Sequence, residues 1–252
     1  MNFVVVKGKR LLLGIIVVAT VSVIVFSGIG ISSAFSKSSK KLPIYRVRTL
    51  EKKIAISFDC AWGDEYTEKL LEIMQEENIT STFFMVEFWT KKYPKHVAKI
   101  DQMGHEIGTH SATHPYMSKL SKEQIIKELT TSSNAITEIT NKKVQVFRPP
   151  YGDYNDRLID TAKELGLYTI QWDVDSLDWK DLSATEIYNR VVKKVKNGSI
   201  VLFHNNGLHT AQALPLIIKE LKQQGYTFTT IGELIYKDNY KMAVDGEQIK
   251  LI

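Results

Sequence analysis

The sequence predicts an α/β fold built on a parallel sheet of about seven strands. From Lys52 onward, short apolar runs typical of strands alternate with longer stretches whose apolar residues recur at helical spacing. Such alternation is typical of parallel strands that are connected by helices. The chain has 252 residues, and residues 50–240 are predicted to form one domain of the usual size for a barrel.

Each predicted element follows from a local signal. Ser121 and Ser183 are good helix N-caps, each with Gln or Glu three residues later to complete a capping box, and Asn155 caps a further helix. Gly104 suits the C-terminal cap of another. The predicted strands are 54–58, 82–86, 106–108, 144–147, 168–172, 199–203 and 227–230. The predicted helices are 67–77, one that ends near 103, 121–139, 155–165, 183–196 and 211–224.

The charge is distributed unevenly along the chain. The net charge is +5, but residues 1–50 hold eight basic residues and no acidic one. The remaining 25 basic and 28 acidic residues give residues 51–252 a net charge of −3, which argues against a nucleic-acid partner. The single cysteine, Cys60, excludes an internal disulfide and a multi-cysteine zinc site.

The N-terminal fifty residues are predicted to direct the protein to a membrane. Residues 11–31 carry no charge and are long enough to cross a bilayer as a helix, and the basic segment 1–10 before them is expected to stay in the cytoplasm. A cleaved signal peptide is the alternative, because Ser32, Ser33 and Ala34 resemble a cleavage site. Either reading exports the domain, with 32–49 as a linker and 241–252 as a C-terminal tail. The anchor reading predicts a single-pass protein of the cell membrane whose folded domain lies outside the cytoplasm.

Polar side chains follow several predicted strands at the point where each strand ends. In parallel sheets the functional groups gather at the carboxyl ends of the strands. The residues in this position are Asp59, His110, His114, Arg148, Asp175, Asp178 and His204. Any one of them alone is more often a surface or capping residue, but together they indicate a functional site.

Two of these residues, His110 and His114, are candidate metal ligands. Neutral imidazole is the commonest protein ligand for zinc and similar divalent metals. Without a group of thiols, the pair needs a carboxylate or water to complete the coordination shell. Two solvated loop histidines are the alternative interpretation, since this spacing is common by chance.

These residues, with their neighbours, resemble the five ordered motifs of the polysaccharide deacetylases, which form carbohydrate esterase family 4 and are also called NodB-homology enzymes. The similar segments are 57–59, 110–114, 148–152, 175–179 and 202–204, and the match covers about residues 50–236. The segment from Asp59 to Glu65 further resembles a branch of the family that is associated with sporulation. The resemblance implies a distorted (β/α) barrel, a divalent metal, zinc above others, and removal of N-acetyl groups from cell-wall glycan.

The resemblance also implies a role for each residue of the site. Asp59 would be the general base, oriented by Arg148, and His110 and His114 would hold the metal. His204 would be the general acid, with its pKa raised by Asp178. The backbone N–H of Tyr151 would stabilise the oxyanion. Trp179 and Leu202 would form the walls of the pocket for the acetyl methyl group.

One position departs from the family pattern. The family usually has a second Asp directly after the base, as the third metal ligand, and this chain has Cys60 there. A thiolate can bind zinc, whereas a buried neutral thiol behaves as a small apolar group. Asp64, five residues after Asp59, is the tentative replacement ligand.

The sequence therefore predicts a membrane-anchored polysaccharide N-deacetylase that acts on the amino sugars of peptidoglycan. Two alternatives stay open. The first is a glycan-binding module of the same fold without turnover, because Cys60 leaves the metal site incomplete. The second is a hydrolase of another amide, such as a peptide bond of the cell wall.

Overall fold

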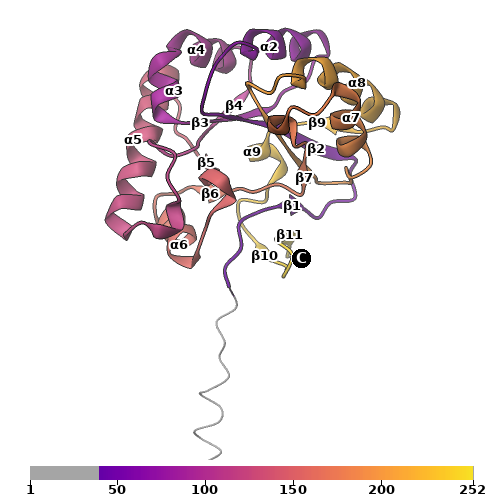
Figure 1. Ribbon diagram of the computed structural model, residues 1–252. Helices are drawn as coiled ribbons and strands as arrows, with labels where there is room; N and C mark the ends of the chain where they lie inside the picture. The colour runs from indigo at the N-terminus through magenta and orange to yellow at the C-terminus, as the bar shows by residue number, and fades with distance from the viewer. Residues whose placement is uncertain (1–39, 252) are drawn as a thin grey trace, which may run out of the picture. The chain divides into compact units, whose positions relative to one another are not determined.

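The centre of the fold is a curled sheet in which all neighbouring strands are parallel (Figure 1). The computed structural model describes residues 40–251. The strands lie in the order β6-β5-β4-β3-β2-β8-β7, and β9 pairs with the start of β2. Their bounds are β2 Lys53–Cys60, β3 Thr82–Met85, β4 Glu106–Thr109, β5 Val146–Phe147, β6 Tyr168–Thr169, β7 Val174–Asp175, β8 Ile200–His204 and β9 Thr227–Phe228.

Helices cover the outer face of this sheet (Figure 1). They are α2 Thr67–Glu76, α3 Glu87–Lys92, α4 Pro94–Gln102, α5 Lys122–Thr140, α6 Asp156–Glu164, α7 Ala184–Val192 and α8 Thr210–Gln223. A further short helix, α9 Ile231–Leu234, lies inside the curl. Three short 3-10 turns complete the set: η1 Met117–Lys119, η2 Pro150–Gly152 and η3 Asp178–Lys180. The predicted capping boxes at Ser121 and Ser183 are present, and Asn155 accepts the cap hydrogen bond from the backbone of Leu158.

The structure confirms the predicted α/β class and the parallel sheet, and it differs in three details. The helix expected to end near 103 is two helices, because Pro94 begins α4 and its ring does not fit the interior of a longer helix. The strand β7 and the short helix α9 were not predicted. The sheet also does not close into a barrel, since no pairing joins β6 to β7 among residues 40–251.

The N-terminal segment 44–47 fills part of the opening between the two ends of the sheet. Ile44 forms a bridge with Ile170, and Arg46 forms one with Ser199. Strand β1 (Arg46–Val47) also joins a second sheet in the order β1-β11-β10, with β10 Tyr240–Met242 and β11 Glu247–Lys250. Residues 44–47 of the expected linker and most of the expected tail are therefore parts of the folded unit.

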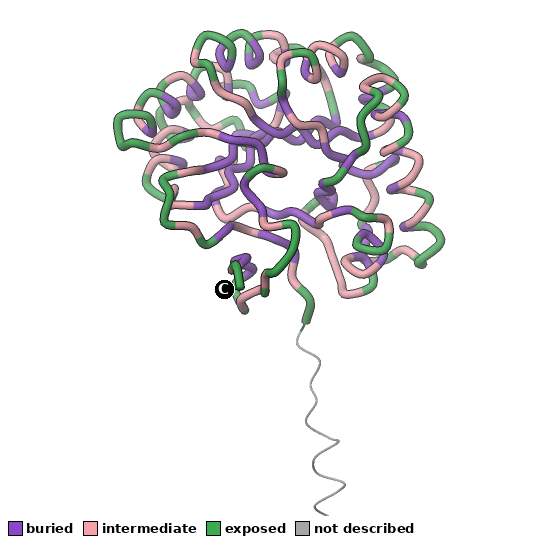
Figure 2. The backbone as a smooth tube through the Cα atoms, turned by 180° about the vertical axis from the view of Figure 1, so that it is seen from behind, coloured by how far each residue is buried: buried purple, intermediate pink, exposed green. Residues whose placement is uncertain are grey.

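Successive side chains of β2 point in turn to the two faces of the sheet, and each face has its own hydrophobic core. Ile54, Ile56, Phe58 and Cys60 point to the large core between the sheet and the helices, whereas Ala55 belongs to a smaller core inside the curl. Residues of α9 fill the inside of the curl together with Ala55. Figure 2 shows the buried strands at the centre and the more exposed helices around them. Asp59 lies on the same inner face as Ala55, at the carboxyl end of β2.

Across residues 40–251, no helix has the length and apolar character that a membrane span requires. The predicted anchor 11–31, like the basic segment 1–10, lies outside the described residues.

Candidate active site

Asp59 and Arg148 meet at the carboxyl ends of β2 and β5. Nη1 of Arg148 donates to Oδ1 of Asp59 (2.8 Å), and Nη2 donates to the hydroxyl of Ser57 (2.8 Å). Both charged side chains are buried. Burial by itself raises the pKa of Asp59, but the positive charge of Arg148 opposes it, together with His110 and His204, and the pKa is lowered below its usual value. Asp59 is therefore an ionised carboxylate with a fixed orientation.

His110 follows β4 and faces the same carboxylate. Its Nδ1 lies 2.7 Å from the carbonyl oxygen of Arg148, so we assign the ring proton to Nδ1 as the donor. Its Nε2 lies 3.6 Å from Oδ2 of Asp59. Burial lowers the pKa of His110 although the charge of Asp59 raises it. The ring is therefore neutral and keeps a lone pair on Nε2.

His114 lies beside His110, with 4.9 Å between the ring centroids. Its backbone adopts a left-handed conformation, with φ at 59°, which is costly for a residue with a Cβ. Burial, helped by His110, lowers the pKa of His114 to about 4, and its Nδ1 is buried without a hydrogen-bond partner. The two neutral imidazoles form the pair that the sequence predicted.

Glu128 of α5 fixes the loop that carries this pair. Its Oε2 accepts hydrogen bonds from the backbone N–H groups of Ala112 (2.9 Å) and Thr113 (2.8 Å), and its Oε1 accepts one from the Thr113 hydroxyl (2.8 Å). Sequence reasoning missed Glu128, because a carboxylate within a long helix carries no local signal that distinguishes it from a solvated side chain.

The residues present do not complete the predicted three-ligand metal site. Because β2 continues through Cys60, the Cys60 side chain points away from Asp59 into the large core, where burial raises the pKa of the thiol well above its usual value. Asp64 does not join the histidine pair, since its Oδ2 lies 3.3 Å from Nδ1 of His96 on α4. Residues 40–251 contain no group of three His, Cys, Asp or Glu side chains that could hold a metal ion.

His204, the last residue of β8, lies next to Asp59 in the register of the sheet. Asp178 accepts hydrogen bonds from the backbone N–H and the ring Nδ1 of His204, and a third from the hydroxyl of Thr210 (2.7 Å). Burial lowers the pKa of His204, but the hydrogen bond and the charge of Asp178 outweigh it, so the pKa is raised above its usual value. The predicted role of His204 as a general acid would fall to Nε2, because Nδ1 is bonded to Asp178. Thr210, which steadies Asp178, was not predicted.

The remaining predicted residues lie on the same edge of the sheet. Tyr151 is in η2 with φ at 59°, and its exposed ring lies 4.6 Å from that of His114. Trp179 is exposed in η3, while Leu202 is buried on β8, two residues before His204. Their predicted roles toward the oxyanion and the acetyl group stay predictions.

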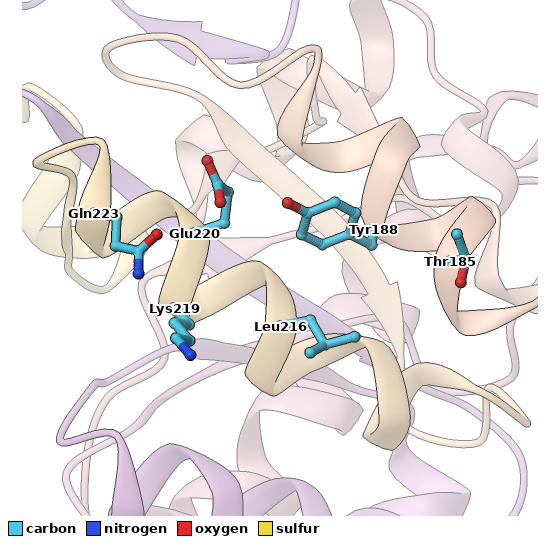
Figure 3. Close-up of a pocket in the computed structure, with 6 residues that line it drawn as sticks. All are labelled: Thr185, Tyr188, Leu216, Lys219, Glu220 and Gln223. Carbon is cyan, nitrogen blue, oxygen red and sulfur yellow. The ribbon is translucent and has the colours of Figure 1, made fainter.

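A cavity of about 350 Å³ lies elsewhere, between α7 and α8 (Figure 3). Its lining consists of Thr185, Tyr188, Leu216, Lys219, Glu220 and Gln223. None of the residues described above lines this cavity.

The comparisons with known proteins agree with the fold. The model of the family described as polysaccharide deacetylase matches residues 46–170. A peptidoglycan-N-acetylglucosamine deacetylase of Bacillus cereus is 37% identical over 196 residues, which cover 76% of this chain and 92% of that protein. The peptidoglycan-N-acetylmuramic acid deacetylase PdaA of Bacillus subtilis is 32% identical, over 79% of this chain and 77% of that protein. This chain belongs to the polysaccharide deacetylase family, known as CE4.

Two further relatives have names that assign them no activity. The uncharacterized protein YlxY of Bacillus subtilis is 34% identical over 81% of this chain, but the match spans only 63% of YlxY. The structure of BA3943 from Bacillus anthracis, named a CE4 family pseudoenzyme, is similar with a TM-score of 0.74 and 35% identity. That match covers 81% of this chain and 69% of BA3943. The family therefore includes both deacetylases and a pseudoenzyme at comparable identity to this chain.

Proposed function

We propose that this protein hydrolyses N-acetyl groups on the amino sugars of a peptidoglycan-type glycan. The observation that carries the proposal is a pair of neighbouring titratable groups with oppositely shifted pKa values. The lowered pKa favours the ionised form of Asp59 and the raised pKa favours the protonated form of His204, which are the states required of a general base and a general acid. The names of the Bacillus cereus and Bacillus subtilis relatives support this substrate class.

The arrangement suits a two-stage amide hydrolysis. Asp59 accepts a proton from a water molecule whose oxygen bonds to the acetyl carbonyl carbon. The C–N bond of the resulting tetrahedral intermediate then breaks, while Nε2 of His204 protonates the departing amine. Acetate and a free amino sugar are the products. Arg148 keeps Asp59 in place through the 2.8 Å hydrogen bond, and the Tyr151 backbone N–H is the proposed oxyanion donor.

We propose that a divalent metal ion, zinc above others, is the cofactor. The two neutral imidazoles supply lone pairs for a cation. The third protein ligand is missing, because Cys60 faces the core and Asp64 pairs with His96. No step of the hydrolysis above is therefore assigned to a metal.

Glycan binding without turnover is the second candidate, and two observations favour it. One is the incomplete set of metal ligands around His110 and His114. The other is the similarity to BA3943, which is named a pseudoenzyme. In this case Asp59 and His204 would serve only to hydrogen-bond an amino sugar.

Acetate release separates these candidates. The full-length chain is incubated with N-acetylglucosamine oligomers, with isolated wall glycan and with wall peptides, each with and without added zinc. Release from the glycans by the wild type, and none by Asp59→Asn, supports the deacetylase. Binding of the glycans without release supports the binding module, and amine release from the peptides alone contradicts both.

We also propose that residues 11–31 anchor the protein in the cell membrane and that the domain from residue 50 onward lies outside the cytoplasm. We further propose a role in spore formation. The support is in the sequence, namely the uncharged apolar run, its basic flank and the Asp59 to Glu65 segment. Cell fractionation tests the location. Full-length protein should sediment with membranes and a chain starting at Ser36 should not, whereas full-length protein in the cytosol contradicts the anchor.

A further inference from the structure

Gln171 is a buried polar residue in the segment that joins β6 to β7, the two ends of the curled sheet. It is 2% exposed. Burial of a side-chain amide is unfavourable unless its polar atoms form hydrogen bonds. The backbone and side chain of Gln171 together contact three separate parts of the fold, namely the N-terminal segment 44–47, the side chain of Arg148 and the η2 turn. Gln171 was not among the predicted site residues.

The backbone of Gln171 connects the N-terminal segment to the proposed base. Its N–H donates a hydrogen bond to the carbonyl oxygen of Ile44 (2.7 Å). Its carbonyl oxygen accepts one from Nη2 of Arg148 (3.3 Å), while Nη1 of the same guanidinium donates to Asp59 (2.8 Å). The position of the Gln171 backbone therefore contributes to the orientation of Arg148 and, through it, of Asp59.

The side chain of Gln171 holds the η2 turn. Its Nε2 donates a hydrogen bond to the carbonyl oxygen of Gly152 (3.0 Å). The approach is close, because a Cβ at position 152 would lie 3.3 Å from Oε1 of Gln171 and 3.2 Å from the ring of Trp172. Gly152 also has φ at 66°, a conformation that glycine adopts without steric cost. The glycine therefore allows the amide to reach the turn.

The η2 turn carries Tyr151 in a strained conformation. With φ at 59°, Tyr151 has a backbone geometry that costs about 1–3 kcal/mol and persists only where the surroundings hold it. Asp153, on one side, accepts hydrogen bonds from the backbone N–H and the hydroxyl of Ser118 (2.8 Å each). Those bonds join the turn to η1, whereas the bond from Gln171 to Gly152 joins it to the segment that also holds Arg148.

We propose that Gln171 is a positioning residue of the active site, which fixes the Tyr151 turn relative to the pair formed by Arg148 and Asp59. This inference rests on the proposed function, in which the Tyr151 N–H is the oxyanion donor. Such a donor accelerates the reaction only if it already lies where the negative charge develops. Because Gln171 bonds to both parts, the spacing between the base and the oxyanion donor depends on this one residue.

Kinetics of the full-length chain test the role in the reaction. Gln171→Met has a similar length but no N–H donor, and Gln171→Asn keeps an amide but is one methylene shorter. Acetate release from N-acetylglucosamine oligomers should show kcat lowered about 10- to 100-fold in each variant. KM should stay unchanged, because the oxyanion forms only on the way to the transition state.

Gln248→Met is the matched control. Gln248 is also fully buried, and its Nε2 donates to the backbone carbonyl of Tyr236 (2.6 Å), but it lies on β11 in the second sheet. Its replacement removes the same kind of hydrogen bond away from the site. Urea denaturation should show a comparable loss of stability, while kcat stays unchanged. An equal loss of kcat in the Gln248 and Gln171 variants overturns the inference.

NMR gives a readout that does not need turnover. The backbone amide signals of Tyr151 and Gly152 should shift in both Gln171 variants and stay in place in Gln248→Met. In the wild type, the side-chain amide protons of Gln171 should exchange slowly with solvent, which tests the contact even if neither variant folds. Unchanged signals, fast exchange or an unchanged kcat in the Gln171 variants overturns the inference. A wild type that releases no acetate contradicts the deacetylase instead, and the NMR signals then decide whether Gln171 holds the turn.

Discussion

Asp178 accepts two hydrogen bonds from His204, one from its backbone N–H and one from its ring Nδ1, and each measures 2.8 Å. The same carboxylate thus fixes the position of the strand end, the orientation of the ring and the tautomer that leaves Nε2 toward the site. Its negative charge also counters the effect of burial on the pKa of His204. One residue therefore sets both the geometry and the protonation of the proposed acid.

Replacing this carboxylate should move the alkaline limit of the reaction. His204 is active when protonated, so the rate falls as the pH rises through its pKa, which is raised above the usual value. Asp178→Asn removes the charge that raises this pKa while burial still lowers it. The alkaline limb should therefore shift to lower pH, and the acid limb, set by Asp59, should stay. Acetate release measured across pH gives the limbs.

Asp175→Asn is the control for this prediction, because Asp175 raises the pKa of His204 less than Asp178 does. We expect a smaller shift from it. NMR titration of the His204 ring gives the same pKa without turnover. A limb and a titration midpoint that stay in place in Asp178→Asn would show that the carboxylate does not control the acid.

Loss of the buried guanidinium should destabilise the whole domain. Arg148→Met leaves the buried Asp59 carboxylate without its partner, and removal of one member of a buried ion pair costs about 3–5 kcal/mol. Urea denaturation gives the free energy of unfolding. The double variant Arg148→Met with Asp59→Asn should recover part of the loss, because no uncompensated charge remains. A loss below about 1 kcal/mol in the single variant would contradict the pairing.

The sequence was sufficient for the parts of the site that depend on topology. Asp59 and His204 lie in the last two residues of their strands, and His110 and Arg148 directly follow theirs. The carboxyl ends of parallel strands meet at one edge of a sheet. Their proximity could therefore be predicted without coordinates. Asp178 was predicted as a residue that follows the strand expected at 168–172, and the structure places it shortly after β7, a strand that was not predicted.

Side-chain direction and long-range pairing could not be predicted in this way. The orientation of Cys60 depends on β2 continuing through that residue, and the partner of Asp64 depends on where α4 packs. Strand β1 pairs with β11, about two hundred residues later, and neither short run has an apolar pattern of its own. The Asp64–His96 contact and the β1–β11 pairing join segments that are distant in sequence, so local residues do not predict them.

The orientation of Cys60 predicts that its thiol takes no part in zinc binding. Cys60→Ala removes a buried sulfur from the large core and should cost about 1 kcal/mol of stability while zinc content stays unchanged. His114→Ala should lower zinc content with little effect on stability. Elemental analysis after dialysis against zinc, with urea denaturation, measures both quantities.

Asp64→Asn is the companion variant and should keep its zinc, because Asp64 pairs with His96. Loss of zinc in Cys60→Ala would show that the thiol is a ligand after all. A wild type that binds no zinc would contradict the predicted cofactor itself.

His105 should make the folded protein sensitive to mild acid. Its ring is buried, its Nδ1 accepts a hydrogen bond from the backbone N–H of Ser81 (3.1 Å), and burial lowers its pKa from 6.5 to about 4. Between these values the unfolded chain binds a proton that the folded chain does not. Stability should therefore fall as the pH drops from about 6.5 to about 4, by about 3 kcal/mol in total from this residue.

His105→Asn tests this contribution, since its amide oxygen can accept the same hydrogen bond and its side chain does not titrate. The free energy of unfolding by urea is measured for both proteins from pH 8 to pH 4. His110 and His114, whose pKa values are also lowered, remain in both proteins, so the difference between the two curves isolates His105. The variant should be less stable at pH 8 because its smaller side chain leaves space beside Phe83, whose ring packs against His105. That deficit should shrink below pH 6.5, and parallel curves would contradict the lowered pKa.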